Sequence, residues 1–267
     1  RRLAIIDTSE AAAQPMHFAG RYTITYNGEI YNYLELRKDL QKAGYNFNTK
    51  SDTEVILAAY DLYKEKCLYY FDGMFSFAIW NEKEQQIFAE RDRQSEKPFY
   101  YYTEKYLFVF ASEMKALWAI GIEKKTDSKM LLNYLTLGHV QNCVDKEQTF
   151  FEDIYSLPPS HYLTFTPSSK QLCKITKYWS ITKEIRIDIL ASDAVDKFTE
   201  LLNISVKRRL RSDVTTGTSL SGGLDSSTIA AFVHQIQNST GGADKAQQLK
   251  TFSAVFPGFE KDESKYI

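Results

Sequence analysis

The feature that most constrains the fold of this chain is a change in sequence pattern near residue 190. Beyond that point the chain has a strand pattern over residues 214–220, a glycine turn with a helix over 225–237, and a second strand over 250–256. This order is the βαβ unit of a parallel sheet. Because an open α/β domain needs several such units to cover both faces of its sheet, we expect residues 190–267 to be the start of a parallel α/β domain.

The first part of the chain has the pattern of antiparallel strands with helices between them. Apolar residues alternate over residues 74–80 and, after a polar break, over residues 86–90, which is typical of a hairpin. Residues 98–102 and 106–111 predict a second, aromatic hairpin. Aromatic residues make up 14% of the chain, and their rings favour half-buried strands. We therefore expect a first domain over residues 1–185 with stacked layers of sheet and helix, an α+β arrangement.

Local signals predict further elements on either side of these strands. Residues 21–26 have the composition of a strand, and Asn27-Gly28 after them is a strong signal for a tight turn. Apolar residues at helical spacing predict a helix over residues 33–43. Ser51-Asp52-Thr53-Glu54 has the form of a capping box, which predicts that another helix starts there. A long amphipathic helix is expected over residues 192–211.

Charge and cysteine use exclude several classes of protein. The 33 Lys and Arg residues nearly balance the 34 Asp and Glu residues, so we expect no nucleic-acid partner and no membrane partner. No apolar run reaches the ~18 to 20 residues that span a bilayer, and no signal peptide is recognisable, so we expect a cytoplasmic protein. The four histidines are scattered without the spacing of a zinc site. Cys67, Cys143 and Cys173 are far apart, and we interpret them as reduced.

The most informative motif is the stretch from Ser221 to Ser227. Its two glycines let the backbone approach an anion, and the helix that follows directs its free N–H groups and positive dipole end towards that anion. Serine hydroxyls can donate to phosphate oxygens, and a carboxylate at Asp225 is explained if it holds Mg²⁺. The motif lacks the lysine of a Walker A loop. It therefore predicts a pyrophosphate site, and the alternative is a plain Gly-Gly turn with a helix cap.

The chain also resembles a known family nearly from end to end. The stretch from Ser221 to Ser227 is similar to the pyrophosphate loop of ATP-pyrophosphatase enzymes, and the other blocks are similar to those of glutamine-hydrolysing asparagine synthetases. In chain order these blocks are Arg2-Leu3-Ala4-Ile5-Ile6-Asp7, Gln14-Pro15, Tyr26-Asn27-Gly28-Glu29-Ile30-Tyr31-Asn32, Ser51-Asp52-Thr53-Glu54, Phe71-Asp72-Gly73-Met74-Phe75, Arg91-Asp92-Arg93, Lys97-Pro98, Ala111-Ser112-Glu113-Met114-Lys115, Leu157-Pro158-Pro159 and Lys177-Tyr178-Trp179. Each block alone is weak, but their order is specific.

The resemblance implies an enzyme with two sites. Residues 1–185 would be a glutaminase domain of the N-terminal-nucleophile type, a layered sandwich without its first strands. Residues 190–267 would be the incomplete start of an ATP-pyrophosphatase domain. The implied reaction is the ATP-driven amidation of aspartate through β-aspartyl-AMP, with ammonia from glutamine and with release of AMP and pyrophosphate. The small molecules would be glutamine, aspartate and ATP with Mg²⁺, with no prosthetic group, and a homodimer stays open.

The resemblance also implies a glutamine site. Arg2 would bind the carboxylate of glutamine and Asp52 its ammonium group, while Glu29 would help to hold the amine. Asn27 and the backbone N–H of Gly28 would form the oxyanion hole, and two such donors suit a developing oxyanion. Asp52 is also explained by helix capping alone, and Arg2 by exposure to solvent.

The second implied site binds the nucleotide. The loop would cradle the pyrophosphate, the residues at its edge would contact the nucleoside, and Asp225 would be the Mg²⁺ ligand. The implied ATP-binding residues are Ser219, Leu220, Ser221, Gly222, Gly223, Leu224, Asp225, Ser226, Ser227 and Ala254.

The chain lacks parts that the family uses. The family nucleophile is a cysteine at the mature N-terminus, activated by its own α-amino group, and this chain has no such cysteine. Cys67 cannot substitute, because neither a free amine nor oxyanion donors accompany it. The groups that build the adenylate would lie beyond residue 267. We therefore expect a piece of a longer protein that lacks glutaminase activity by itself.

Two local departures leave alternatives open. Gln94-Ser95-Glu96 replaces an apolar family triplet, and residues 215–219 are more polar than a buried parallel strand. The departures are explained either by sequence drift at the protein surface or by a related enzyme that uses another acceptor. Such an enzyme would close a β-lactam ring or amidate cell-surface sugars. The missing nucleophile suits a third alternative, a non-catalytic glutaminase-like module. The sequence fixes neither the acceptor acid, the oligomeric state nor the ammonia path.

Overall fold

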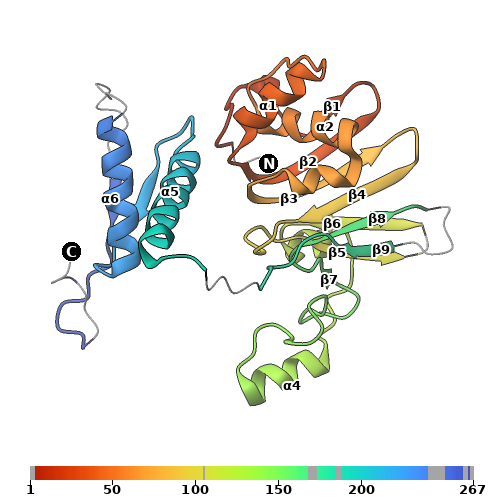
Figure 1. Ribbon diagram of the computed structural model, residues 1–267. Coiled ribbons are helices and arrows are strands. Elements are labelled where there is room, and N and C mark those ends of the chain that lie inside the picture. The colour runs from red at the N-terminus through yellow and green to blue at the C-terminus, as the bar shows by residue number, and fades with distance from the viewer. Residues whose placement is uncertain are drawn as a thin grey trace. The chain divides into compact units, whose positions relative to one another are not determined.

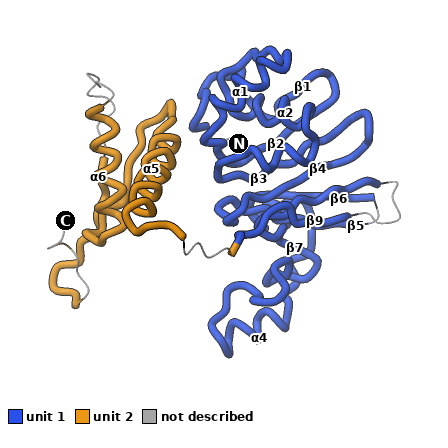
Figure 2. The backbone as a smooth tube through the Cα atoms, in the orientation of Figure 1, with its two compact units in different colours: residues 1–182 blue, residues 183–267 orange. Residues whose placement is uncertain are grey.

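The computed structural model describes residues 4–104, 106–167, 173–183, 188–239, 250–260 and 264. The chain divides into two compact units, residues 1–182 and residues 183–267, which Figure 2 shows in different colours. We refer to them as unit 1 and unit 2. Each unit has a hydrophobic core of its own.

Unit 1 is built around a six-stranded antiparallel sheet with the order β1-β2-β3-β4-β8-β9. Strands β2 and β3 pair along their whole length, from Tyr22 opposite Asn81 to Ile30 opposite Gly73. The hairpin predicted from alternating apolar residues is the β3–β4 pair. The strands are β1 (Met16–Phe18), β2 (Tyr22–Ile30), β3 (Gly73–Asn81), β4 (Gln86–Arg91), β8 (His161–Phe165) and β9 (Cys173–Lys177).

Helices α1 (Tyr33–Lys42) and α2 (Asp52–Tyr63) cover one face of this sheet (Figure 1). The core beneath them collects every second residue of β3, beginning with Phe75 and Phe77. Burial of each such aromatic side chain stabilises the fold by about 3 kcal/mol. Helix α2 is buried from Asp52 to Tyr60, so its packing reaches nearly around the helix.

The opposite face of the six-stranded sheet packs against a second, three-stranded sheet with the order β6-β5-β7. Ala78 and Ala89 of the large sheet meet rings such as Tyr101 from the small one, and Phe108 stacks on Phe165 with ring centroids 5.1 Å apart. Unit 1 is therefore a sandwich of helices, a large sheet and a small sheet, which confirms the predicted fold class. The small sheet contains β5 (Tyr100–Glu104), β6 (Leu107–Ala111) and β7 (Tyr155–Ser156).

Unit 1 also contains short helices in its connections. Helix α4 has Asp127 as N-cap, whose side chain accepts a hydrogen bond from Met130 N, and it ends at Gly138 with a φ of 69°. The sequence patterns discussed above did not predict α3 or α4. These helices are η1 (Glu10–Ala12), η2 (Lys64–Tyr69), α3 (Met114–Ala119) and α4 (Ser128–Leu137).

Unit 2 has the expected βαβ order after one long helix. Helix α5 (Ala191–Arg209) is followed by β10 (Gly217–Ser219), α6 (Leu224–Ser239) and β11 (Lys250–Phe252). Strands β10 and β11 pair in parallel, as the pattern predicted. The small core between α5 and α6 contains Val206, Val233 and Ile236. Both strands are shorter than expected.

The prediction of a turn at Asn27-Gly28 is wrong. Both residues lie inside β2, where Asn27 is opposite Ser76 and Gly28 is opposite Phe75. The glycine serves a close approach between strands. Gly28 has a φ of +150°, and a Cβ there would lie 2.2 Å from the carbonyl oxygen of Met74. Position 28 therefore requires glycine because the neighbouring strand β3 passes so close, and not because the chain turns there.

The predicted capping box forms only in part. Ser51 is the N-cap of α2, and its hydroxyl accepts from Thr53 N at 3.1 Å. The carboxylate of Glu54 does not return to the Ser51 amide. It instead accepts from Asn48 N and Thr49 N, at 2.9 and 2.8 Å. Glu54 therefore organises the residues before the helix.

The two departures from the family pattern lie at the surface. Gln94 and Glu96 are exposed, because their backbone amides turn inwards and donate to the buried carboxylate of Asp92 at 2.9 and 3.0 Å. In this chain only Thr218 of strand β10 is half-buried. Among the described residues, no helix combines the length and apolar character needed to cross a membrane.

Candidate functional site

An inter-sheet cavity of about 500 Å³ opens between the two sheets of unit 1. It lies beside the centre of β2 and β3, and its far wall comes from Phe99 and the end of β6. The half-buried Asn27 lines this cavity, and its Nδ2 donates to Ser112 Oγ at 3.2 Å. The lining residues are Gln14, Pro15, Thr25, Tyr26, Asn27, Ser76, Phe77, Ala78, Phe99, Phe110, Ala111 and Ser112.

Two glycines bring the backbones of β2 and β3 unusually close next to this cavity. A Cβ on Gly28 would collide with Met74, and a Cβ on Gly73 would lie 2.2 Å from the Glu29 carbonyl oxygen. Both contacts are with backbone atoms, which cannot move aside as a flexible side chain can. The position of Asn27 is therefore set by a rigid strand pair.

Asp52 lies behind the cavity wall. It is only 3% exposed, and it does not belong to the residues that line the cavity. Its Oδ2 accepts from Tyr26 OH at 2.8 Å and from Ile30 N at 3.0 Å. Tyr26 lines the cavity itself. The structure thus connects Asp52 to the cavity by one hydrogen bond through a residue that the sequence analysis did not assign.

Burial sets the charge state of this region. Burial and the Asp52 carboxylate raise the pKa of Tyr26 well above its usual value, so the phenol keeps its proton and donates. The carboxylate of Glu29, which is 5% exposed, also raises the pKa of Tyr26. Burial and the charge of Asp92 raise the pKa of Glu90 well above its usual value, which favours a neutral carboxyl group there.

The other residues predicted to bind glutamine are Gly28, Glu29 and Arg2. Gly28 and Glu29 follow Asn27 in β2, and neither belongs to the residues that line the inter-sheet cavity. Arg2 lies outside the described residues. Tyr26 and Ser112 were not assigned from the sequence, although both lie in blocks that carried the resemblance.

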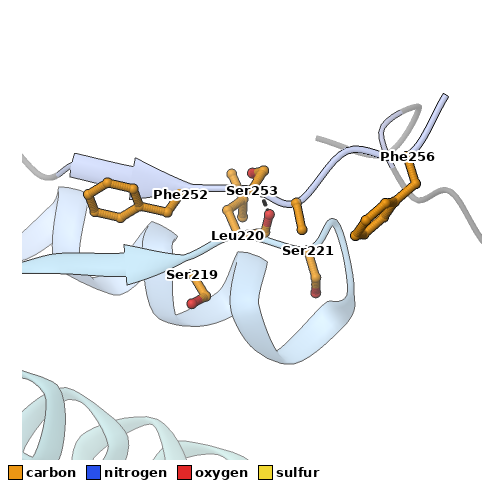
Figure 3. A pocket seen from close by; sticks show the side chains of 7 residues that line it. Ser219, Leu220, Ser221, Phe252, Ser253 and Phe256 are labelled. Atoms are coloured by element: carbon orange, nitrogen blue, oxygen red, sulfur yellow. Dashed lines mark hydrogen bonds between the residues drawn. The ribbon is translucent and has the colours of Figure 1, made fainter.

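A second cavity of about 470 Å³ lies beside the glycine loop of unit 2; we call it the loop cavity (Figure 3). Four of the residues predicted to bind ATP line it: Ser219, Leu220, Ser221 and Ala254. Three further lining residues were not predicted: Phe252, Ser253 and Phe256. The hydroxyl of Ser253 donates to the Leu220 carbonyl oxygen at 2.5 Å, which joins the two strand ends at the cavity (Figure 3).

The glycine loop has the local structure expected of a turn into a helix. Gly222 has a φ of 79°, a conformation that glycine adopts without strain. The Ser221 and Ser226 hydroxyls lie 3.2 Å apart, and Ser226 Oγ donates to Gly223 O at 3.1 Å. Because α6 begins at Leu224, its first amides lie at this loop. Serine hydroxyls and helix amides together suit an anion.

Asp225 lies in the first turn of α6 and is exposed. Among the described residues, no group of three or more His, Cys, Asp or Glu side chains could hold a metal by itself. Mg²⁺ usually keeps several waters and binds through one or two carboxylates together with substrate phosphates. One exposed carboxylate at the start of α6 fits that donor set. Gly222, Gly223, Leu224, Ser226 and Ser227 complete the loop without lining the loop cavity.

Family comparisons match both units. A glutamine amidotransferase domain matches residues 1–179, and an asparagine synthase domain matches residues 197–267. Asparagine synthetase [glutamine-hydrolyzing] 3 of Bacillus subtilis is 40% identical over 235 residues, which cover 86% of this chain and 37% of that protein. Asparagine synthetase [glutamine-hydrolyzing] 1 of the same organism is 36% identical over 259 residues, which cover 96% of this chain and 38% of that protein.

This chain thus spans less than two fifths of the length of these two curated relatives. Among solved structures, a glutamine phosphoribosylpyrophosphate amidotransferase from B. subtilis is similar, with a TM-score of 0.47 and 18% sequence identity. The match covers 92% of this chain and 49% of that chain.

Proposed function

The chain belongs to the glutamine-hydrolysing asparagine synthetase family, and we propose that it contributes a glutamine site and an ATP site to an amide-forming ligase. In this reaction the side-chain carboxylate of aspartate attacks ATP to form β-aspartyl-AMP, and pyrophosphate leaves. Ammonia released from glutamine then attacks the adenylate, and AMP leaves. The observation that carries the proposal is the presence of one cavity in each unit, the first lined by the assigned Asn27 and the second by the assigned Ser219, Leu220, Ser221 and Ala254.

In the glutamine site, Asn27 is the group best placed to act on the substrate amide. Its Nδ2 already donates to a hydroxyl at the cavity wall, so it can donate to an amide oxygen in the same place. With the N–H of Gly28 it would form a two-donor oxyanion hole, in which each donor typically contributes ~3 kcal/mol. Asp52 and Glu29 would balance the ammonium group of glutamine, and Arg2 its carboxylate.

In the ATP site, the loop from Ser221 to Ser227 would hold the pyrophosphate against the N-terminus of α6. Asp225 would hold Mg²⁺, which neutralises the phosphate charge as the leaving group develops. Leu220 and Ala254 would contact the nucleoside from the wall of the loop cavity, together with Ser219.

The test uses the complete gene product with glutamine, aspartate and ATP. We expect AMP, pyrophosphate and asparagine to form in equal amounts. Release of ADP and phosphate would contradict the proposal. Release of glutamate without aspartate-dependent exchange of pyrophosphate into ATP would instead indicate another acceptor, and absence of glutamate release would indicate a non-catalytic module.

For the isolated chain we expect no release of glutamate from glutamine. None of the described residues that line the inter-sheet cavity is a cysteine. Cys67 is fully buried, and burial raises the pKa of its thiol well above the usual value. A glutamate assay on residues 1–267, with the complete gene product as control, measures this directly. Turnover by the isolated chain above the buffer rate would contradict the expectation.

A further inference from the structure

The four residues before α2 form a loop whose backbone is held by charged side chains. Glu54 accepts from two amides of this loop, as described above. Arg37 of α1 donates to the Thr49 carbonyl oxygen at 2.6 Å and to the Ser51 carbonyl oxygen at 2.8 Å. Asp7 accepts from Lys50 N at 2.8 Å. Such density of bonding to charged groups fixes the start of α2 and therefore the position of Asp52.

Asp7 differs from the other two charged residues in where it comes from. Arg37 and Glu54 belong to the helices on either side of the loop, whereas Asp7 lies 43 residues before Lys50 in sequence. Asp7 is 8% exposed and has a φ of 54°, a conformation that aspartate and asparagine tolerate better than most residues. Its other oxygen accepts from Ser9 N and Ser9 Oγ, at 3.2 and 2.6 Å.

The segment that carries Asp7 also reaches the inter-sheet cavity. Gln14 lines that cavity, and its Oε1 accepts from Tyr26 N at 2.7 Å. Tyr26 in turn donates to Asp52. Three hydrogen bonds and two stretches of chain therefore form a closed ring. The bonds join Asp7 to Lys50, Asp52 to Tyr26, and Tyr26 to Gln14; the chain joins Lys50 to Asp52 and Gln14 to Asp7. A closed ring restrains the Asp52 carboxylate relative to the cavity wall better than any one bond could.

We propose that Asp7 is a positioning residue for glutamine recognition, acting through Lys50 on Asp52. The inference rests on the proposed glutamine site.

The test compares Asp7→Asn with Ser9→Ala in the complete gene product. Asparagine keeps the shape and tolerates the backbone conformation, but it removes the charge and leaves one acceptor oxygen where the carboxylate had two. Lys50 N or Ser9 therefore loses its acceptor, and the bond that remains is to a neutral oxygen. We expect the glutamine KM of Asp7→Asn to rise about tenfold, the effect of losing one hydrogen bond to a charged group. Its kcat and its ammonia-dependent activity should stay within about twofold of the wild type. Ser9→Ala, which keeps the Lys50 contact, should leave the glutamine KM within about twofold.

A double-mutant cycle separates positioning from general support of the fold. In an Asp52→Ala background, Asp7→Asn should raise the glutamine KM no further, because its effect passes through Asp52. Fully additive effects of the two substitutions on the glutamine KM would overturn the proposal. An unchanged glutamine KM in Asp7→Asn alone, or equal losses of its glutamine-dependent and ammonia-dependent activity, would also overturn it. If Asp7→Asn does not fold, Arg37→Lys takes its place, since lysine lacks the forked guanidinium whose two nitrogens reach the two loop carbonyls. Lys38→Gln on the same helix is its control.

Failure of the proposed function has a different signature. If the complete gene product makes no asparagine, the affinity of the same variants for glutamine is measured by calorimetry. A tenfold weaker affinity of Asp7→Asn would support positioning at a glutamine site whatever the acceptor. Wild-type affinity in that variant would overturn the inference, and lack of glutamine binding by the wild type would overturn both.

Discussion

The inter-sheet cavity of unit 1 and the loop cavity of unit 2 are assembled in different ways. The first draws its walls from segments between Gln14 and Ser112, which long-range strand pairing brings together. The second is made by the ends of two neighbouring parallel strands and the turn between one of them and a helix. The first site therefore depends on tertiary packing, whereas the second follows from a short stretch of sequence. The two should respond differently to mutation.

The largest expected effect is on the stability of unit 1. Gly28→Ala places a Cβ against backbone atoms of β3, and we expect it to lower the free energy of unfolding by about 3 kcal/mol or more. Chemical denaturation of the chain measures this. The matched control is Gly20→Ala, which has a φ of 61° but open space around it and should cost about 1–2 kcal/mol. Equal costs would mean that strand contact does not constrain this site.

The next effect concerns the loop cavity alone. Asp225→Asn removes the exposed carboxylate expected to hold Mg²⁺, and we expect the KM for MgATP to rise about hundredfold in the complete gene product. Because Asp225 is exposed on α6, the variant should keep its stability and its glutamine hydrolysis. Loss of glutamate release in this variant would contradict the separation of the two sites.

A smaller effect on activity should follow from Asp52→Ala. We expect the glutamine KM to rise about tenfold while ammonia-dependent synthesis is spared. Asp52 is buried and bonded to Tyr26 OH and Ile30 N, so some loss of stability should accompany the change, unlike at Asp225. Steady-state kinetics with each nitrogen source distinguish the outcomes, and equal losses with both would indicate a folding defect.

A final effect is a pH dependence of stability in unit 1. The pKa of Glu90 is raised in the folded state, so above the unfolded value of about 4.5 the unfolded chain loses a proton that the folded chain retains. Stability contributed by neutral Glu90 is therefore full below that pH and declines as pH rises, by at most about 1.4 kcal/mol per pH unit. Glu90→Gln should flatten this decline between pH 5 and 7. Parallel denaturation curves for both proteins across that range would contradict it.

The contrast between the cavities also explains what the sequence could predict. The helix, the glycine turn and the parallel strands of unit 2 follow from local signals, and so does Ser221 at its cavity, whereas Ser219, Leu220 and Ala254 were assigned through the family resemblance. In unit 1 the same kind of reasoning predicted a turn at Asn27-Gly28, because the dipeptide looks alike in a turn and in a strand. Only the partner strand, more than 40 residues away, decides between them.

The role of Tyr26 was beyond sequence reasoning for a similar reason. A tyrosine in a strand predicts half-buried surface, and nothing local indicates that its hydroxyl reaches Asp52 on a helix. Phe252 and Phe256 likewise line the loop cavity because of where β11 ends and how the chain continues after it. The sequence predicted the bounds of this strand only approximately. The assignments of Arg2, Asn27, Gly28, Glu29 and Asp52 to glutamine stay predictions, as do those of the loop residues to ATP.

The loop around Asp92 has a practical consequence. Its shape is set by main-chain amides of Gln94, Glu96 and Lys97 converging on one carboxylate, so the side chains at its tip contribute little to it. Gln94 and Glu96 can therefore accept a fluorophore or an affinity handle through a substituted cysteine, provided that Asp92 is kept. Such a label would report on unit 1 from outside both cavities.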